Sequence, residues 1–228
     1  MTTYLPMAPP GGPLRVGVLV SGQGTTLQAL LDDAASGAPY AVVLVLSNVP
    51  DAPALDRARR AGVPACTVDY RGRPRQAFEV DVARVLEAAQ VELVCLAGFL
   101  RILSPWFVER FRGRVVNIHP SLLPRFGGRG MYGLRVHQAV LASGDPQSGC
   151  TVHLVDETPD GGPVLAQAVV PVLPQDTPEC LAQRVAAVEH RLYPQVVRAI
   201  AEGRLLGLRP PASSAQDGAP APLRVGAP

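Results

Sequence analysis

The sequence predicts an α/β protein with an open, mostly parallel, twisted sheet and helices on both faces of that sheet. In the first half of the chain, short apolar runs alternate with segments whose apolar residues recur at helical spacing. The apolar runs are continuous, which is typical of parallel strands buried on both faces. In the second half, two β-rich segments and a long helical pattern predict a C-terminal β segment and a long helix.

Alternation of strands and helices is clearest before residue 120. Four apolar runs are expected to form parallel strands, at Arg15–Val20, Ala41–Leu46, Val91–Leu96 and Arg114–Ile118. Three segments between them are expected to be helices, at Thr26–Ala35, Ala52–Ala61 and Arg75–Ala89. Because strand–helix–strand crossovers are almost always right-handed, such units build one sheet with helices packed against it.

The rest of the chain extends this domain and ends in a biased segment. Two further strands and a long helix are expected at Cys150–Val155, Pro163–Val172 and Pro178–Ile200. A length of 228 residues suits one α/β domain, which we expect over residues 14–208. Residues 1–13 and 209–228 are rich in Pro, Gly and Ala, and we expect both ends to be flexible because they contain few core-forming residues.

Composition excludes several classes of function. The chain carries 21 basic and 19 acidic residues, a formal net charge of +2, so it has no excess of positive charge for a nucleic-acid backbone. Every basic residue is an arginine. The absence of lysine excludes Schiff-base and pyridoxal-phosphate enzymes and the usual phosphate-loop NTPases.

The spacing of the cysteines and the hydropathy of the chain exclude further classes of protein. The four cysteines are far apart and lack CxxC spacing, so no metal site is predicted. No apolar run approaches the roughly 20 residues that span a bilayer, and the N-terminus lacks the pattern of a signal peptide. We therefore expect a cytoplasmic protein that acts on small molecules, without nucleic-acid or membrane partners. The sequence leaves open whether it is a monomer or a homodimer.

A glycine-containing turn after the first predicted strand is one candidate site. In Ser21–Asp32 (SGQGTTLQALLD), two glycines allow a sharp turn, and Thr25 and Thr26 can cap the following helix. Free N–H groups at a helix N-terminus can bind phosphate. The pattern is not that of a dinucleotide-binding turn, because Leu27 stands where a third glycine is needed. From these residues alone, a phosphate site and a turn without a ligand are equally compatible with the sequence.

Two further segments carry residues suited to catalysis. Asn117 and His119 lie two residues apart at the end of a predicted strand, so their side chains share one face. An amide donor beside an imidazole can hold a carbonyl oxygen that becomes an oxyanion, although a structural role for the pair is equally possible. Asp160 lies in the turn Asp156–Gly162 (DETPDGG). Placed near His119, its carboxylate would raise the pKa of that histidine and relay a proton.

Five segments in this order resemble the phosphoribosylglycinamide formyltransferase family, also called glycinamide ribonucleotide transformylases. They are Ser21–Asp32, Leu96–Pro105 (LAGFLRILSP), Asn117–Pro124 (NIHPSLLP), Cys150–Gln167 and Val188–Pro194 (VEHRLYP). The resemblance covers about residues 15–208 and implies a formyltransferase-type, Rossmann-like fold. It also implies transfer of a formyl group from 10-formyltetrahydrofolate, a co-substrate, to the amine of 5-phosphoribosylglycinamide in purine (IMP) biosynthesis, with no metal.

The resemblance implies roles at matching positions. The implied catalytic residues are Asn117, His119 and Asp160. The implied contacts to phosphoribosylglycinamide are Gly24, Thr25, Thr26 and Glu189. The implied folate contacts are Arg75, Leu100, Arg101, Ile102, Leu103 and Asn117. In the implied mechanism, Asn117 and a protonated His119 stabilise the oxyanion, while Asp160 keeps the imidazole charged and accepts the proton of the amine.

The chain also departs from this family. At Gly24–Thr26 the family most often has Gly-Ser-Asn, and Ala186 stands where many members have Gln or Lys. The segment Arg125–Gln138 is longer than the usual loop of the family, and its glycines predict a mobile flap over the nucleotide. We expect Arg129 in this flap to supply the missing cation.

Three other histidines lie outside the implied catalytic set. His153 falls on an apolar strand pattern, and we expect a satisfied core histidine there rather than a partner of the catalytic residues. His137 and His190 fall in helical patterns and carry no expected role.

Other functions on the same fold remain as alternatives. Methionyl-tRNA formyltransferase and formyltetrahydrofolate deformylase share the Asn-x-His pattern but carry further domains, so the length of the chain disfavours both. A non-catalytic nucleotide-binding module would have no need of Asn117, His119 and Asp160 together. Formyl transfer to an amine is therefore expected, with a deformylase-like hydrolase and a silent binding module as the alternatives.

Overall fold

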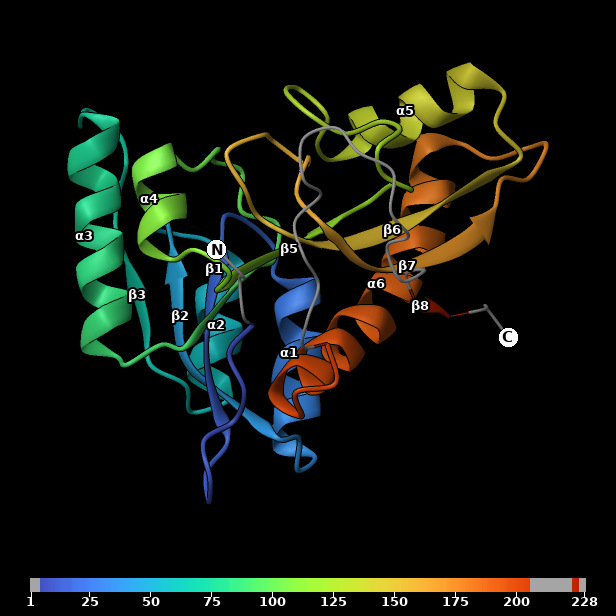
Figure 1. The fold of residues 1–228 in the computed structure, drawn as a ribbon. Helices are drawn as coiled ribbons and strands as arrows, with labels where there is room; N and C mark the ends of the chain where they lie inside the picture. Colours follow the sequence, from blue (N-terminus) through green and yellow to red (C-terminus); the bar gives the residue numbers. More distant parts are fainter. Residues whose placement is uncertain (1–4, 206–222, 226–228) are drawn as a thin grey trace, which may run out of the picture.

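The computed structural model describes residues 5–205 and 223–225 (Figure 1). The strands are β1 Leu14–Val20, β2 Tyr40–Ser47, β3 Ala65–Thr67, β4 Leu93–Leu96, β5 Val115–His119, β6 Gln147–Leu154, β7 Val164–Pro171 and β8 Leu223–Val225. The helices are α1 Thr25–Ala35, α2 Pro53–Arg60, α3 Arg75–Ala88, α4 Pro105–Arg110, α5 Leu134–Ser143 and α6 Pro178–Ala201. Every strand and helix predicted from the sequence is present, with ends that differ by at most three residues.

The eight strands of the described residues belong to one sheet, in the order β3-β2-β1-β4-β5-β6-β7-β8. Strands β3, β2, β1, β4 and β5 are parallel, whereas β5–β6 and β6–β7 pair antiparallel, and β8 runs parallel to β7. The predicted mostly parallel sheet with a C-terminal β segment is therefore confirmed. From β1 the chain builds β2 and β3 on one side of that strand and then continues with β4 on its other side. Open α/β sheets bind ligands at the carboxyl ends of the strands near such a reversal of strand order.

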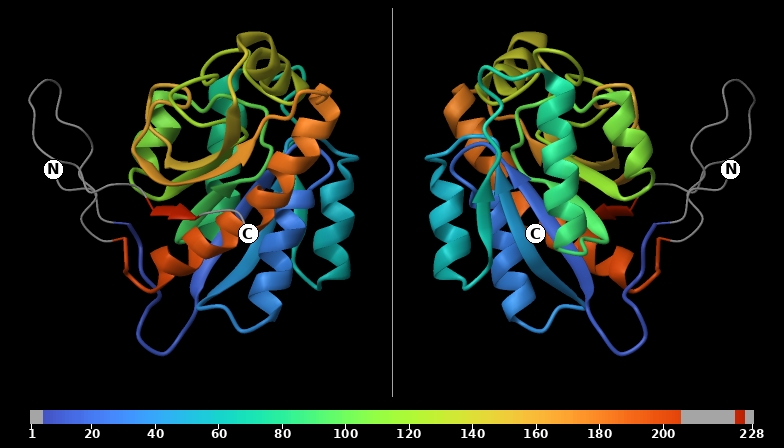
Figure 2. Two further views of the ribbon diagram at one scale, coloured as in Figure 1. Left: turned by 90° about the vertical axis from the view of Figure 1, so that its right-hand side faces the viewer. Right: turned by 90° about the vertical axis from the view of Figure 1, so that its left-hand side faces the viewer.

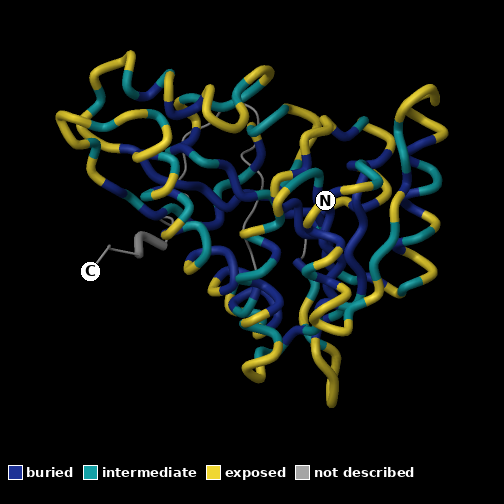
Figure 3. Tube along the Cα trace, turned by 180° about the vertical axis from the view of Figure 1, so that it is seen from behind, coloured by how far each residue is buried: buried dark blue, intermediate teal, exposed yellow. Residues whose placement is uncertain are grey.

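Helices cover both faces of the sheet. Figure 1 shows α3 and α4 on one side and α1 and α6 on the other. Successive residues of the strands alternate between two hydrophobic clusters, one packed against α1 and α6 and the other against α3 and α4. In β4, for example, Cys95 belongs to the first cluster and Val94 to the second. Figure 3 shows the resulting core as buried strands surrounded by more exposed helices and loops.

Helix α6 is tied to the sheet beside the carboxyl ends of β4 and β5. Figure 2 shows it lying next to α1, and Arg198 on α6 makes an ion pair with Asp33 on α1, with an Nε–Oδ2 distance of 2.8 Å. The buried Tyr193 donates its hydroxyl to the carbonyls of Leu96 and Val116, at 3.1 and 3.0 Å. These bonds fix the position of α6 relative to the strand ends where the cavity described below lies.

Four elements were not predicted from the sequence, namely β3, α4, α5 and β8. Strand β3 has only three residues, too few for a clear hydropathy pattern. Helix α4 has six residues and begins after Ser104, whose hydroxyl accepts the N–H of Phe107, with a proline in its first turn. Helix α5 begins at Leu134, inside the segment expected to be a mobile loop, because the helical pattern of Leu134–Ser143 follows directly on the glycine-rich stretch.

The two ends of the chain are described only in part. The expected flexible N-terminus contains Leu5, which is buried in the core, and the N–H of Ala8 donates to the carbonyl of Ala201 at 2.9 Å. Apolar contact and a backbone hydrogen bond thus attach part of residues 5–13 to the domain. Of the expected C-terminal tail, Leu223–Val225 forms β8, and the remainder lies outside the described residues. No helix in the described ranges is long and apolar enough to cross a membrane.

Candidate active site

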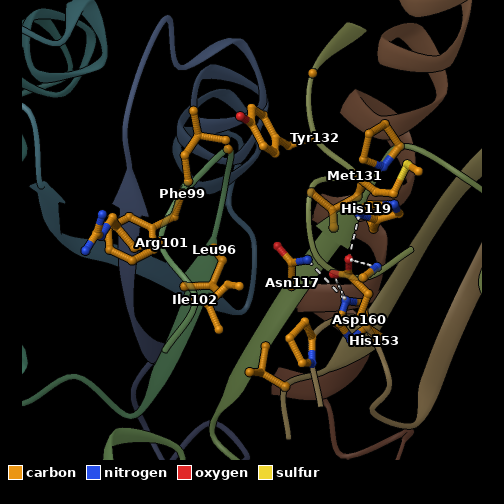
Figure 4. Close-up of a pocket in the computed structure, with 18 of the residues that line it drawn as sticks. Leu96, Phe99, Arg101, Ile102, Asn117, His119, Met131, Tyr132, His153 and Asp160 are labelled. Carbon is orange, nitrogen blue, oxygen red and sulfur yellow. Dashed lines mark hydrogen bonds and ion pairs between the residues drawn. The ribbon is translucent and has the colours of Figure 1, made fainter. Parts of the chain in front are cut away.

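A cavity of about 750 Å³ opens at the carboxyl ends of β1, β4 and β5. Its lining has two opposite walls, which Figure 4 shows to the right and left of the opening. We call the strand-borne side, with Asn117, His119, His153 and Asp160, the catalytic wall. We call the other side, formed by Phe99–Leu103 between β4 and α4, the loop wall.

Strand register places the side chains of the catalytic wall together. In β5 the alternate residues Val116 and Ile118 pack in the core on the α6 side, so Asn117 and His119 face the opposite side of the sheet. The antiparallel pairing of β5 and β6 sets His153 directly across from Asn117. Because Asn117 and His119 both line the cavity, the prediction that they share one face is confirmed.

A hydrogen bond between Asn117 and His153 orients the amide group. The Nδ1–H of His153 donates to the carbonyl of Leu154 at 2.9 Å, and a carbonyl oxygen can only accept. In the neutral imidazole, Nε2 is then the acceptor, and it receives an N–H from Nδ2 of Asn117 at 3.1 Å. One N–H of the Asn117 amide remains for a ligand in the cavity.

Asp160 lies between two imidazoles. Its Oδ2 is 3.5 Å from Nδ1 of His119, and its Oδ1 is 3.6 Å from Nε2 of His153. The Oδ2 atom also accepts the backbone N–H of Gly128 at 2.8 Å. On the other side of its ring, His119 donates from Nε2 to the carbonyl of Phe126 at 2.8 Å. The turn that contains Asp160 therefore lies beside His119. This proximity was the condition for a catalytic role of Asp160.

Burial and the neighbouring charged groups have opposite effects on the pKa of His119, and likewise on the pKa of Asp160. Burial lowers the pKa of His119, and the negative charge of Asp160 raises it by less, so the net pKa lies below the ordinary value. Burial raises the pKa of Asp160, but the neighbouring imidazoles of His153 and His119 and the N–H of Gly128 together lower it further than burial raises it. The expectation that Asp160 keeps His119 charged is therefore wrong for the unliganded protein, because the imidazole is only 5% exposed.

The glycine turn after β1 lies at one end of the cavity. Gly24 is the N-cap residue of α1, with φ of 70°, and a Cβ on it would lie 2.6 Å from the Cβ of Ala54. Only glycine fits this close approach between the turn and α2. No side chain caps α1, so the capping predicted for Thr25 and Thr26 is wrong; both residues line the cavity instead. The first N–H groups of the helix are left without intrahelical partners.

Glu189 lines the cavity from α6, one helical turn before the anchoring residue Tyr193. Burial raises the pKa of its carboxyl to about 7. Among the described residues, no hydrogen-bond donor pairs with this carboxylate. Glu189 therefore offers an acceptor to a ligand, at an energetic cost of ionisation that falls as the pH rises.

Three side chains hold the loop wall, one from the end of β1 and two from α3. The backbone N–H of Leu100 donates to Oγ of Ser21 at 2.8 Å, at the end of β1. Arg75 on α3 donates to the carbonyl of Ile102. Glu79, one turn further along α3 and almost fully buried, accepts the backbone N–H of Ser104 at 2.8 Å and also binds its hydroxyl. The wall itself presents backbone groups and the exposed side chains of Leu100 and Ile102.

Most of the residues expected at a site line this one cavity. They are Thr25, Thr26, Leu100, Arg101, Ile102, Leu103, Asn117, His119, Asp160 and Glu189. Gly24 and Arg75 do not line it. Gly24 shapes the turn, and the guanidinium of Arg75 is engaged by Glu79, at 3.1 Å, and by the loop wall.

Two histidines given no catalytic role by the sequence analysis also belong to the cavity. His153 was expected to be a satisfied core residue, but it contacts both Asn117 and Asp160. The period-two pattern of its strand places its side chain on the face opposite to the core residues Val152 and Leu154, which was the one signal in the sequence that it does not belong to that part of the core. His137 on α5 lines the cavity, and its buried Nδ1 has no hydrogen-bond partner among the described residues. In the same ranges, no group of three or more His, Cys, Asp or Glu side chains could hold a metal ion.

Asn, His and Asp side chains gathered beside an open cavity are typical of an enzyme active site. Comparison with known proteins identifies the family to which this enzyme belongs. The model of the formyl transferase family matches residues 14–197, so the chain belongs to that family. It is 40% identical over 194 residues to phosphoribosylglycinamide formyltransferase of Haemophilus influenzae, covering 84% of this chain and 89% of that protein. It is also 46% identical over 195 residues to the trifunctional purine biosynthetic protein adenosine-3 of Drosophila pseudoobscura pseudoobscura. There the match covers 84% of this chain but only 14% of the longer relative.

A solved structure agrees with the fold described above. Glycinamide ribonucleotide transformylase 1 from Symbiobacterium toebii superposes with a TM-score of 0.80 and 47% sequence identity, covering 85% of this chain and 90% of that one. The resemblance to phosphoribosylglycinamide formyltransferases is thus supported by both sequence and structure.

Proposed function

We propose that the protein transfers a formyl group from 10-formyltetrahydrofolate to the amine of 5-phosphoribosylglycinamide. The observation that carries the proposal is the meeting of Asn117, His119 and Asp160 at one cavity, from two separate segments of the chain, β5 and the turn after β6. The similarity to enzymes named for this reaction supports the choice of substrates. A binding module would not need an oriented amide and a histidine–carboxylate pair at the same place.

The loop wall and the α1 end of the cavity suit the two substrates. The loop wall offers backbone groups and the apolar side chains of Leu100 and Ile102, which fits a flat, polar-edged pterin. At the other end of the cavity, the N-terminus of α1, with Thr25 and Thr26, fits a phosphate, and the carboxylate of Glu189 fits ribose hydroxyls. The formyl group would then lie between the walls, beside Asn117.

Formyl transfer begins with attack of the substrate amine on the formyl carbon. The new C–N bond forms as the C=O π electrons move to oxygen, giving a tetrahedral adduct with an oxyanion. The free N–H of the Asn117 amide donates to that oxygen, and His153 keeps the amide in the orientation that makes this possible. Collapse of the adduct breaks its bond to N10 of the folate and leaves the formylated amine.

His119 and Asp160 together handle the proton that the amine releases. The Nε2–H of His119 is engaged by the carbonyl of Phe126, so Nδ1, which faces Asp160, is the ring nitrogen that gains a proton. The lowered pKa of His119 keeps it neutral and able to accept before attack. The resulting imidazolium is paired with the ionised Asp160, lies near the oxyanion, and returns the proton to N10 as the adduct collapses.

The test is an amine-dependent turnover assay. The purified protein is mixed with 10-formyltetrahydrofolate and glycinamide ribonucleotide, and the absorbance change of the folate is followed. We expect turnover only when the amine substrate is present. Turnover without the amine would instead identify a deformylase-like hydrolase, and no turnover by a folded protein would leave the binding module as the better account.

A further inference from the structure

We propose that Arg129 binds the phosphate of the nucleotide substrate, and that the segment carrying it, residues 126–133, transmits this binding to His119 and Asp160. The inference rests on the proposed function, in which the substrate is a phosphomonoester. It adds a cationic residue to the phosphate contacts proposed at the N-terminus of α1, which lines the same cavity, and a physical link between the phosphate and the catalytic pair.

The balance of charge in the cavity points to Arg129. A phosphomonoester carries between one and two negative charges near pH 7, which favours a cationic partner. The chain has no lysine, and the arginines that line the cavity in the described ranges are Arg101 and Arg129. The guanidinium of Arg101 lies on the loop wall, 4.3 Å from the centre of the Tyr70 ring. Arg129 is exposed, and among the described residues no acceptor engages its side chain.

A second observation indicates a ligand beside this segment. His137 lies on α5, the helix that follows residues 126–133 directly, and it lines the same cavity. Only 4% of the residue is exposed, yet its Nδ1 has no hydrogen-bond partner among the described residues. A buried polar atom without a partner is unfavourable, and a ligand held by the neighbouring segment would satisfy it.

The backbone of the same segment holds the catalytic pair. The carbonyl of Phe126 accepts Nε2–H of His119 at 2.8 Å, and the N–H of Gly128 donates to Oδ2 of Asp160, also at 2.8 Å. These two groups lie three residues and one residue before Arg129. A movement of the segment therefore changes the bonds that orient both catalytic side chains.

Packing at Gly127 makes this connection tight. A Cβ on Gly127 would lie 2.5 Å from Cδ2 of Leu123 and 3.2 Å from the Cβ of Asp160, so the segment lies directly against the catalytic carboxylate. The preceding residue, Phe126, has φ of 56°, a conformation that non-glycine residues rarely adopt and that surrounding contacts must maintain. Binding of phosphate at Arg129 would stabilise this arrangement, so that energy from a non-reacting part of the substrate serves the reacting part.

The first test compares substrates with and without the phosphate. Formyl transfer to glycinamide ribonucleotide and to the dephosphorylated glycinamide riboside is measured for the wild type and for Arg129→Ala, Arg129→Lys and Arg135→Ala. We expect Arg129→Ala to lower kcat/KM for the nucleotide about 10- to 100-fold, the range for a lost hydrogen bond to a charged group, and to leave kcat/KM for the riboside unchanged. Arg129→Lys should restore part of the activity because it keeps the charge.

Arg135 provides the matched control. It is also exposed and lies six residues further along the chain, but its guanidinium lies 5.1 Å from the centre of the Tyr132 ring and it does not line the cavity. Arg135→Ala should leave both substrates unaffected within about twofold. Equal losses for nucleotide and riboside in Arg129→Ala would overturn the proposal, since they would indicate a structural role. An unchanged kcat/KM for the nucleotide would overturn it as well.

The second test supplies the phosphate as a separate piece. Inorganic phosphite added to the riboside reaction should raise kcat/KM of the wild type, because the dianion occupies the phosphate site and stabilises the arrangement of residues 126–133 that holds His119 and Asp160. It should have no effect on Arg129→Ala. Failure of phosphite to activate the wild type would remove the link between the phosphate and the catalytic pair.

A binding measurement separates this proposal from the proposed function. Calorimetric titration with ribose 5-phosphate requires no turnover. If the wild type fails to transfer formyl groups but Arg129→Ala still weakens ribose 5-phosphate binding at least tenfold, the reaction is misassigned and the phosphate contact stands. If the two proteins bind ribose 5-phosphate equally, the contact is wrong whatever reaction the enzyme catalyses.

Discussion

The two walls of the cavity are built in different ways. The catalytic wall begins with two paired strands, whose register alone sets His153 opposite Asn117. The loop wall has no regular structure, and its shape depends on side-chain bonds from Ser21, Arg75 and Glu79 in other elements. In the proposed function, the chemistry is thus placed on two paired strands and one turn packed against them, whereas recognition of the flat co-substrate is given to a loop whose backbone groups remain free.

This contrast predicts separate kinetic signatures. Changes to the catalytic wall should lower kcat with little effect on the KM of either substrate, because those residues act on the adduct. Changes to the supports of the loop wall should raise the KM of the folate selectively. A variant of one wall that lowered kcat and raised the folate KM together would contradict this difference between the walls.

The largest effect is expected from Asp160→Asn. This change removes the charge that stabilises the protonated form of His119 and should lower kcat about 10²- to 10⁴-fold, the usual range for general acid–base catalysis. Steady-state kinetics with both substrates measures the loss, and circular dichroism checks that the variant is folded. A kcat within a few-fold of the wild type would remove Asp160 from the mechanism.

A smaller loss is expected from His153→Phe. The aromatic ring fills similar space but leaves the N–H of Asn117 without its acceptor, so the amide is no longer oriented. We expect kcat to fall about 10- to 100-fold, as for an unsatisfied buried donor, with both KM values nearly unchanged. If kcat stays at the wild-type level, His153 is the core residue that the sequence suggested.

The loop wall is tested by Glu79→Gln. Glutamine keeps an acceptor for the backbone of Ser104 but loses the charge that pairs with Arg75. The KM for 10-formyltetrahydrofolate should rise about tenfold, while the KM for the nucleotide stays constant. The control is Glu87→Gln on the same helix, which breaks an exposed ion pair with Arg110 and should change neither KM. Equal increases in both KM values would show that Glu79 supports the whole fold rather than this wall.

The smallest effect at neutral pH is expected from the titration of Glu189. The pKa of Glu189 is raised to about 7 by burial, so its carboxyl is protonated in the free protein below that pH. Ribose hydroxyls donate to the ionised form, and the nucleotide KM should therefore rise as the pH falls below about 7, by up to tenfold per unit. In Glu189→Gln this part of the pH dependence should disappear, so the ratio of the two KM profiles is the measurement. A constant ratio between pH 5 and 8 would contradict the role.

Local pattern was enough to predict most of the fold and part of the site. Continuous apolar runs identified the parallel strands, and period-two spacing placed Asn117 and His119 on one face. The role of His153 depended on which strand pairs with β5 and in which register, which no local pattern specifies. The lowered pKa of His119 depended on how much protein surrounds the ring, and the sequence suggested only the opposing charge of Asp160. Arg75 was assigned to the folate by resemblance, whereas its direction is set by Glu79 and the carbonyl of Ile102.

The most direct test of the central claim is the stoichiometry of formyl transfer. The wild type is incubated with glycinamide ribonucleotide and 10-formyltetrahydrofolate, and mass spectrometry quantifies the formylated nucleotide, the released tetrahydrofolate and free formate. We expect equal amounts of formylated nucleotide and tetrahydrofolate, with no formate above the uncatalysed level. Tetrahydrofolate and formate released in equal amounts without formylated nucleotide would contradict the account, since the catalytic wall would then activate water rather than the amine.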